Sequence, residues 1–424
     1  MKIAIMTTLA NFDESYSLVS VIIHQTRILK KYSGLDVELW VLNNCKDDYP
    51  EDIKDNIKKV VPVFKWINGS INNSMVPIIQ NVIQLGINSG IKYFICHDLI
   101  FVDSYITYNE AIRRVAGVNS GVKWYHWIHS GPHSRPSVLS TRLDVLRYTL
   151  PRNSELVYLN YFDHQRAANM YAGVTTANSH VVYNPVEPLD LTDISDKTAL
   201  EIDKVVDFSS SLVRCIYPFS TTRMDSKRIN IVLEILNIIK NRELTVKFIA
   251  CNCHANDIKE KNSVDSIIKK FTTKPYILEK TDLMFTSTYD VPKYEYSIPH
   301  KTVVDLFKLS NLFIFPTVSE VCPLILQEAA LTNNLIVSNA DFPSLMEITG
   351  PNGALFFQFG SAHHNVSYGN NTEKERINYF NWVVDNIIPE LDRGFYQTNA
   401  MYNVLKNYSY EAVWNKQLKQ MLNL

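Results

Sequence analysis

Long apolar runs and an excess of one charge are both missing from this chain of 424 residues. No apolar run reaches the roughly 20 residues that a transmembrane helix needs, so we expect none. The formal net charge is −1, so no global field would recruit nucleic acid or an anionic lipid surface. The six cysteines are scattered without the spacing of a disulfide framework, and a reducing, cytoplasmic location is the expectation.

Motifs that hold metal ions are also missing. No two Asp residues are separated by a single residue, so the D-x-D motif of metal-dependent sugar transferases is absent. His126, His129 and His133 would share a face only on a helix, which Gly131-Pro132 interrupts. Cys251-Asn-Cys253-His254 lacks the two-residue spacing and the second pair of a zinc site. We therefore predict a protein that needs no metal and no cofactor.

Short apolar segments alternate with helical patterns in the first half of the chain, which predicts a parallel sheet covered by helices on both faces. The segment Lys2–Met6 leads into acidic residues without a small-residue cleavage site, so we interpret it as a buried strand and not as a signal peptide. Further strands are expected at Val37–Leu42, Val60–Val63, Tyr93–Cys96, Lys123–Ile128, Leu156–Leu159 and His180–Tyr183, and helices at Leu18–Lys31 and Ser104–Val115.

A second alternating series follows the turn Asn184–Pro188 and the polar, acidic stretch Leu189–Lys204, where we place the domain boundary. Two α/β domains are therefore predicted, residues 1–188 and 189–409, followed by an amphipathic segment 410–424. Ligands of such folds bind at the carboxyl ends of the strands, here in a cleft expected between the domains. The second domain has expected strands at Val205–Ser209, Thr245–Ala250, Tyr276–Leu278, Leu312–Phe315, Leu335–Ser338 and Ala354–Phe357, and expected helices at Lys227–Asn241, Asp257–Phe271, Lys301–Leu309, Pro323–Leu331 and Glu373–Glu390.

Two glutamates, Glu320 and Glu328, follow an apolar run that ends at Pro316. A short polar turn carries the first carboxylate, and an apolar-periodic helix carries the second. If the whole segment were helical, the two carboxylates would lie about 12 Å apart along the axis. That separation suits a ligand with hydroxyl groups at both ends and a charged linker, as in a nucleotide sugar. The plain alternative is a chance pair of glutamates, but their place after a buried strand favours a ligand site.

Basic residues and a histidine stand at two other strand exits. Arg223, Lys227 and Arg228 follow a strand of the second domain and open a helix. Arg offers a bidentate fork and Lys a mobile point charge, and both suit phosphate oxygens, although a solvated loop is the commoner fate of such a run. His129 stands at the exit of a strand in the first domain, whereas His126 alternates with apolar neighbours and fits a hydrogen-bonded core residue.

Together these segments resemble the retaining GT-B glycosyltransferases of family four. The stretch Ser319–Ser338 resembles that family's E-x7-E segment with the strand that follows it. The resemblance spans most of the chain and implies a GT-B fold of two Rossmann-like domains, the first binding the acceptor and completed by helix 410–424, the second binding the nucleotide-sugar donor. The other segments with a family counterpart are Trp127–Ser130 (a His loop), Val181–Glu187 (an interdomain turn), Arg223 with Lys227 (a basic phosphate pair) and Tyr408–Trp414 (a closing helix).

The resemblance implies a role for each matching position. Glu328 would accept the ribose hydroxyls, and Glu320 would contact hydroxyls of the donor sugar. His129 would face the sugar or the acceptor. Arg223 and Lys227 would stabilise the negative charge on the departing diphosphate. The family's retaining chemistry uses neither a protein nucleophile nor a metal. The remaining implied donor contacts are Val321, Cys322, Leu324 and Arg228, and Arg228 or Arg214 could substitute for a member of the basic pair Arg223 and Lys227.

Three features depart from the family's pattern. The first loop, Leu9–Tyr16, carries no Gly for a close approach of the backbone to a diphosphate. Arg223 and Lys227 are one or two residues closer together in the sequence than the basic pair of the family usually is. Asn333 replaces a Gly after the helix, which is benign because Asn tolerates the left-handed conformation.

The leading hypothesis is a glycosyltransferase that moves a sugar from a nucleoside-diphosphate sugar to an unknown hydroxyl acceptor. A nucleotide-sugar 2-epimerase of the same architecture and a catalytically degenerate nucleotide-sugar-binding protein stay open. The acceptor could be a glycan, a lipid, a protein or a nucleic acid. A cluster of basic residues could mark a peripheral membrane contact, although a solvated helix face beside a core Trp is the plainer interpretation. That cluster consists of Lys54, Lys58, Lys59, Lys65 and Trp66.

Overall fold

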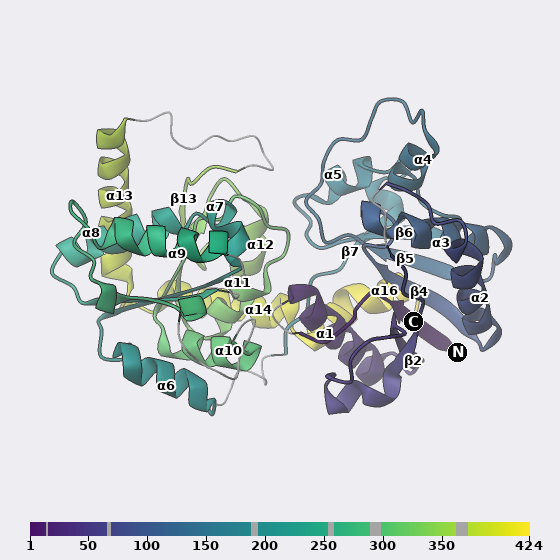
Figure 1. The fold of residues 1–424 in the computed structure, drawn as a ribbon, viewed down its shortest axis with the longest axis horizontal. Helices are drawn as coiled ribbons and strands as arrows, with labels where there is room; N and C mark the ends of the chain where they lie inside the picture. Colours follow the sequence, from purple (N-terminus) through teal and green to yellow (C-terminus); the bar gives the residue numbers. More distant parts are fainter. Residues whose placement is uncertain (14–15, 66–68, 188–193, 253–257, 289–297, 362–371) are drawn as a thin grey trace. The chain divides into compact units, whose positions relative to one another are not determined.

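The chain folds into two compact α/β units, each with its own parallel sheet (Figure 1). Residues 1–185 together with 410–424 form the first unit, and residues 186–409 form the second. The computed structural model describes residues 1–13, 16–65, 69–187, 194–252, 258–288, 298–361 and 372–424. The assignment of the first unit to an acceptor and of the second to a donor stays a prediction.

The described part of the first unit contains a sheet of seven parallel strands in the order β3-β2-β1-β4-β5-β6-β7. β1 pairs with both β2 and β4, so the chain builds one edge of the sheet and then returns to build the other. Ile3 to Met6 are completely buried, as expected of an apolar strand that is covered on both faces. The strands are β1 Lys2–Met6, β2 Asp36–Leu42, β3 Ile57–Val61, β4 Ile91–His97, β5 Lys123–Trp127, β6 Ser154–Tyr158 and β7 Ser179–Val181.

Helices cover both faces of this sheet. On one face α2 packs against α3 over a core that includes Trp40, Phe94 and Trp124. The rings of Phe94 and Trp124 are stacked with their centroids 4.4 Å apart. The helices of the unit are α1 Ser17–Tyr32, α2 Met75–Asn88, α3 Ile106–Val118, α4 Arg142–Tyr148 and α5 His164–Asn169.

The C-terminal segment packs beside α1 on the other face of the first sheet, where Figure 1 shows it in yellow. It consists of α15 Tyr410–Val413, a π-helical turn Trp414–Leu418 and α16 Lys419–Leu422. Tyr32 of α1 stacks on Trp414 with ring centroids 6.1 Å apart. Tyr125 of β5 donates a hydrogen bond of 2.8 Å to the Met421 carbonyl, so side chains of this strand reach both helical layers.

The described part of the second unit contains a sheet of six parallel strands in the order β10-β9-β8-β11-β12-β13. Its strands are β8 Val213–Phe219, β9 Val246–Asn252, β10 Leu283–Phe285, β11 Leu312–Phe315, β12 Leu335–Asn339 and β13 Leu355–Phe357. Its helices are α6 Lys197–Val206, α7 Met224–Lys227, α8 Ile229–Asn241, α9 Ile258–Phe271, α10 His300–Leu309, α11 Leu324–Leu331, α12 Ser344–Thr349, α13 Glu373–Ile387 and α14 Phe395–Tyr408. β8 pairs with both β9 and β11, so the order reverses between β8 and β11 just as it does between β1 and β4.

Two strands expected from the sequence are wrong. Val205–Ser209 straddles the end of α6, which Asp196 caps by accepting a 2.9 Å hydrogen bond from the Ala199 amide and which stops at Asp207 in a left-handed conformation. Tyr276–Leu278 is not paired; the strand next to β9 comes later, at β10. The expected acidic linker therefore contains a helix from Lys197 onward, and residues 188–193 of that linker lie outside the described residues.

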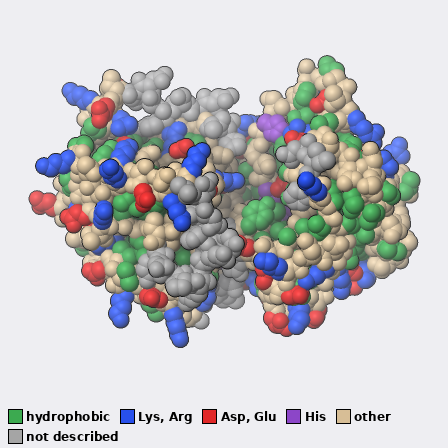
Figure 2. Space-filling model, viewed as in Figure 1, with side chains coloured by type: hydrophobic (Ala, Val, Ile, Leu, Met, Phe, Trp, Pro, Cys, Tyr) green, Lys and Arg blue, Asp and Glu red, His purple; other side chains and the backbone are tan. Residues whose placement is uncertain are grey.

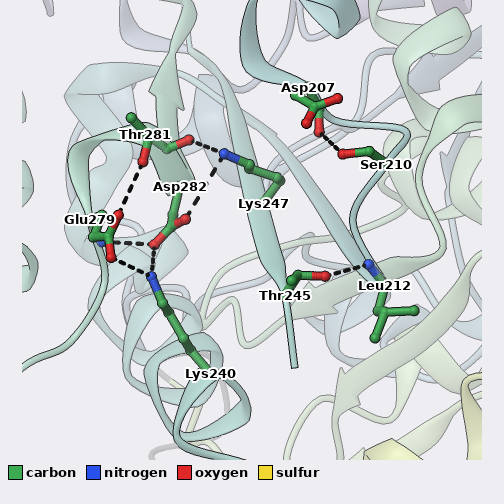
Figure 3. Close-up of polar contacts among 9 residues, drawn as sticks. All are labelled: Asp207, Ser210, Leu212, Lys240, Thr245, Lys247, Glu279, Thr281 and Asp282. Carbon is green, nitrogen blue, oxygen red and sulfur yellow. Dashed lines mark hydrogen bonds and ion pairs between the residues drawn. The ribbon is translucent and has the colours of Figure 1, made fainter. Parts of the chain in front are cut away.

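A network of ion pairs and hydrogen bonds lies at the amino-terminal edge of the second sheet (Figure 3). Lys240 near the end of α8 contacts Asp282 at 2.5 Å, and Lys247 near the start of β9 donates to the Thr281 carbonyl at 2.6 Å. These contacts lie at the amino-terminal ends of the strands, opposite the edge where α/β proteins bind ligands. On the face drawn in Figure 2, acidic and basic side chains are interspersed over the described surface of each unit, in keeping with the net charge of −1.

Candidate functional site

The basic loop and the first glutamate follow the two strands that flank the reversal in the second sheet. The loop leaves β8 at Phe219, and Glu320 lies in the segment that leaves β11 at Phe315. The two segments are joined where the Val318 amide donates a 3.0 Å hydrogen bond to the Ser226 carbonyl. Such a reversal opens a crevice at the carboxyl ends of the strands, the usual ligand site of a doubly wound sheet.

Lys227 and Glu320 form an ion pair at this edge. Both side chains are largely buried, with exposed fractions of 8% and 14%, and the Lys227 ammonium also lies 5.6 Å from the centre of the Phe315 ring. Burial, together with the charge of Arg223, lowers the pKa of Lys227 to about 7. The Glu320 carboxylate acts in the opposite direction, because it favours the charged ammonium. The structure thus brings together two of the residues that the sequence singled out.

The other arginines differ in what they can offer a ligand. Arg223 is exposed beside the Lys227 ammonium, where a phosphate could reach it. Arg228 stands in a left-handed conformation between α7 and α8, and its guanidinium donates to the Phe359 carbonyl. Arg214 is wrong as a substitute for the basic pair, because it lies near the amino-terminal end of β8 and donates to the Leu309 carbonyl at 2.8 Å.

Glu328 is a buried carboxylate, and one of its two oxygens accepts no hydrogen bond from the described residues. It lies on α11 with 4% of its surface exposed, and its Oε1 accepts a hydrogen bond of 2.8 Å from His300 Nε2. Its Oε2 is buried and has no hydrogen-bond partner among the described residues. A carboxylate oxygen in that state costs free energy unless a donor reaches it, so it suits a ligand hydroxyl.

The segment between the glutamates is not helical throughout. α11 begins only at Leu324, with Pro323 as its N-cap residue, so Glu320 and the two residues after it belong to a loop. The separation expected for a continuous helix is therefore wrong. Val321 and Cys322 are buried in that loop, and the Cys322 Sγ accepts a 3.7 Å hydrogen bond from Gln327. Asn333 takes the left-handed conformation expected of the residue after the helix.

His129 follows β5 in the first unit and contacts a second histidine. His97 Nδ1 and His129 Nε2 are 2.9 Å apart, and His97 Nε2 is 2.8 Å from the Gln25 Oε1. Two backbone amides in the first loop of this unit already have side-chain acceptors. The Phe12 amide donates to Asp48 at 3.0 Å, and the Leu9 amide donates to Thr7 Oγ1 at 3.4 Å. Those two amides are therefore not offered to a diphosphate.

The three histidines proposed and rejected as a zinc set do not converge. His126 is completely buried and its Nε2 lies 3.1 Å from Ser154 Oγ, as expected of a core residue, while His133 packs against Phe101 with ring centroids 4.8 Å apart. Within the described ranges, no group of three or more His, Cys, Asp or Glu side chains is placed to hold a metal ion. Cys253 and His254 of the other rejected motif lie outside the described residues.

His126 predicts a pH dependence of stability. Burial, together with the charge of Arg113, lowers the pKa of His126 from 6.5 to about 3. The imidazole stays neutral in the folded chain but gains a proton in the unfolded chain below 6.5, so stability is complete above that pH and is lost as the pH falls. Between pH 6.5 and about 5 the loss should be about 2 kcal/mol from this residue. Urea unfolding of His126→Gln should show a correspondingly weaker pH dependence than the wild type, and an unchanged dependence would contradict the prediction.

The lysines proposed for a membrane contact are partly occupied by other partners. Lys59 pairs with Asp47 at 2.6 Å and Lys54 with Glu51 at 3.2 Å, whereas Trp66 lies outside the described residues. These pairs favour the plainer interpretation of a solvated surface. Each helix in the described part of the chain is too short or too polar to span a membrane.

The sequence analysis missed three participants of these contacts, His300, His97 and Gln25. Each stands outside the motifs that the sequence brought forward, and each acquires its role through a partner that is distant along the chain. His300 opens α10 and reaches α11, while Gln25 of α1 reaches the end of β4. A polar residue inside the apolar pattern of α1 was the one available hint for Gln25.

The two doubly wound units, with a terminal segment that belongs to the first unit, define the GT-B fold that the sequence predicted. No family model matches this sequence, and no curated protein matches it. Solved structures match it over almost its whole length. The fold-class prediction is therefore confirmed.

Three solved structures illustrate the likeness. A glycosyltransferase from Rickettsia africae has a TM-score of 0.67 at 12% identity, covering 99% of this chain and 98% of its own. HepE of Anabaena, in complex with UDP, has a TM-score of 0.67 at 11% identity, with full coverage of both chains. Sucrose-phosphate synthase from Thermosynechococcus elongatus has a TM-score of 0.66 at 10% identity, covering 100% of this chain and 98% of its own. At such identities the likeness establishes the shared fold.

Proposed function

We propose that this chain is a glycosyltransferase that takes a nucleoside-diphosphate sugar as donor. The observation that carries the proposal is Glu328, a buried carboxylate with an open oxygen, on the helix that follows the Lys227–Glu320 pair. A nucleotide sugar presents ribose hydroxyls to such an oxygen and a diphosphate to a buried ammonium. HepE, which has the same fold, was solved with UDP and with UDP-glucose, which supports this donor class.

The proposed reaction assigns one task to each group. Glu328 accepts hydrogen bonds from the ribose, and Glu320 turns to the hydroxyls of the sugar once the diphosphate takes its place beside Lys227. Lys227 and Arg223 stabilise the negative charge that develops on the leaving diphosphate, which is electrostatic stabilisation of the transition state. Val321 and Cys322 of the loop and Leu324 at the start of α11 contact the donor, Arg228 fixes the basic loop, and His129 contacts the sugar or the acceptor.

We further propose that transfer proceeds with retention and without a metal ion. The resemblance of Ser319–Ser338 to the E-x7-E segment supports retention, in which the leaving phosphate helps to deprotonate the incoming hydroxyl. Two cationic side chains at the strand ends support a diphosphate that needs no divalent cation. The acceptor is a hydroxyl compound of unassigned class.

The test is direct. Calorimetry with a panel of nucleoside-diphosphate hexoses should give a dissociation constant below the millimolar range for at least one, and NMR of the product should show the anomeric configuration of the donor. Activity should persist in a chelator. Absence of binding at millimolar concentration overturns the proposal, and an inverted product overturns retention.

A second candidate is a nucleotide-sugar-binding protein without transfer, or an epimerase. The first loop favours the binding protein, since that loop has no Gly and its Leu9 and Phe12 amides are engaged within the first unit. Incubation of the donor alone separates the candidates: an epimerase converts it, a transferase converts it only with acceptor or hydrolyses it slowly, and a binding protein leaves it intact.

A further inference from the structure

A chain of three side chains links α1 to the ends of two neighbouring strands of the first unit, β4 and β5, of which β4 flanks the strand-order reversal. Gln25 comes from α1, His97 is the last residue of β4, and His129 follows β5. The Gln25 Oε1 lies 2.8 Å from His97 Nε2, and His97 Nδ1 lies 2.9 Å from His129 Nε2. The centroids of the two imidazole rings are 5.1 Å apart and their planes are inclined by 26°, so the rings meet edge to edge through this contact. The strand register pairs His97 with Trp127, which brings the two histidines to the same edge.

With the Gln25 amide oriented so that its Oε1 faces His97, the positions of the protons follow from this chain. An amide oxygen can only accept, so the Gln25 Oε1 requires a proton on His97 Nε2. A neutral imidazole carries one N–H, so His97 Nδ1 must accept, and His129 Nε2 must donate to it. The remaining nitrogen of His129, Nδ1, then carries a lone pair. No partner for it exists among the described residues.

The surroundings keep both rings neutral. Burial lowers the pKa of His97 well below 6.5, and the neighbouring His129 lowers it further. Burial also lowers the pKa of His129, against the opposing charge of Asp98, which accepts a 3.0 Å hydrogen bond from the His129 amide. Gln25 brings no charge, and the Trp127 ring packs 5.7 Å from the His97 ring. A neutral acceptor nitrogen suits a hydroxyl group and would repel a phosphate oxygen.

We propose that Gln25 and His97 are positioning residues that hold His129 in the tautomer whose Nδ1 accepts a hydrogen bond from a substrate hydroxyl. The assignment of that hydroxyl to the sugar or the acceptor rests on the proposed function, whereas the tautomer does not. The reversed Gln25 amide is the competing arrangement. Its NH2 group would donate to His97 Nε2, reverse every hydrogen bond in the chain, and present a His129 N–H to the substrate.

Tautomers are measured by long-range ¹H–¹⁵N NMR of the protein with ¹⁵N-labelled histidine, with His97→Asn and His129→Gln used for assignment. We expect both rings in the Nε2–H form at neutral pH. In Gln25→Met and in His97→Phe, His129 should become a mixture of tautomers. In His97→Asn, an amide oxygen can replace Nδ1 as acceptor, so His129 should keep its tautomer. A His129 in the Nδ1–H form in the wild type overturns the proposal whatever the protein's function.

Kinetics tests the positioning role. Gln25→Met and His97→Phe should each lower kcat by about tenfold with little change in the KM of the donor, because they misplace a group without removing a binding contact. His97→Asn should recover kcat to within about threefold of the wild type. If Gln25→Met releases the tautomer and kcat does not change, the positioning role is overturned. If no nucleotide sugar is turned over at all, the proposed function fails while the NMR result still decides the tautomer.

Discussion

Replacing Lys227 with methionine should lower kcat/KM for sugar transfer by about 10²- to 10³-fold. The Lys227 ammonium is the buried cation at the ends of β8 and β11, and in the proposed reaction it faces the charge that develops on the leaving diphosphate. Methionine keeps most of the volume against Phe315 but removes the charge. Initial rates at low donor concentration, measured for wild type and variant, give the ratio directly.

The control for this prediction must separate lost charge from lost stability. Without Lys227 the Glu320 carboxylate stays largely buried without its ion-pair partner, which should cost about 1–3 kcal/mol of unfolding free energy. The double variant Lys227→Met/Glu320→Gln should regain part of that stability but no activity. Lys247→Met, which changes a lysine at the opposite edge of the same sheet, should keep activity. A Lys227→Met variant with near wild-type kcat/KM would remove Lys227 from the mechanism.

The same lysine predicts a basic limb in the pH profile. The pKa of Lys227 is lowered to about 7, so the free protein loses the ammonium charge as the pH rises. Since kcat/KM reports the free protein, it should fall with rising pH between about 7 and the 10.5 of an ordinary lysine. In Lys227→Arg the guanidinium keeps its charge, so that limb should disappear even if the absolute rate is lower.

Replacing Glu328 with glutamine should weaken donor binding by about 10- to 100-fold, the equivalent of about 1.5–3 kcal/mol for hydrogen bonds to a charged group. The substitution keeps the size of the side chain and replaces one carboxylate oxygen by an amide NH2, which cannot accept from a hydroxyl. The His300 contact can persist through the remaining oxygen. Calorimetry with a nucleoside diphosphate and with its sugar conjugate measures the loss.

Glu328 and Glu320 can be told apart by the ligand used. Glu328→Gln should weaken the nucleoside diphosphate and the nucleotide sugar alike, and should reduce the preference for ribose over 2′-deoxyribose. Glu320→Gln should affect the nucleotide sugar far more than the nucleoside diphosphate, because its contact is with the sugar. Equal effects of both variants on both ligands would contradict the division of roles.

Sequence patterns located those strands whose own residues are sufficient to specify a strand. Lys2–Met6 and Leu312–Phe315 were placed to the residue, because a short apolar run between polar turns has few alternatives to a buried parallel strand. Val205–Ser209 failed because two adjacent valines fit a strand or a helix end equally well. The choice came from outside the segment, where Thr302 of α10 donates a 2.9 Å hydrogen bond to Asp196 at the start of α6.

The candidate site divides in the same way. Glu320, Glu328 and His129 stand at strand exits or on the following helix, and the alternation of apolar runs and turns is enough to mark such positions. Lys227 was expected after a strand at Val205–Ser209, but the strand that precedes it is β8, which the sequence analysis did not expect. The partners of these residues come from strand order. Lys227 meets Glu320 because β8 and β11 are neighbours, and Gln25 of α1 reaches His97 at the end of β4, 72 residues away along the chain. The sequence by itself determined two α/β domains and where polar chemistry leaves the strands, since period and composition are local. Only the tertiary structure decided which carboxylate is paired, which oxygen is left open and which nitrogen is fixed, because hydrogen bonds and burial depend on neighbours that are distant along the chain.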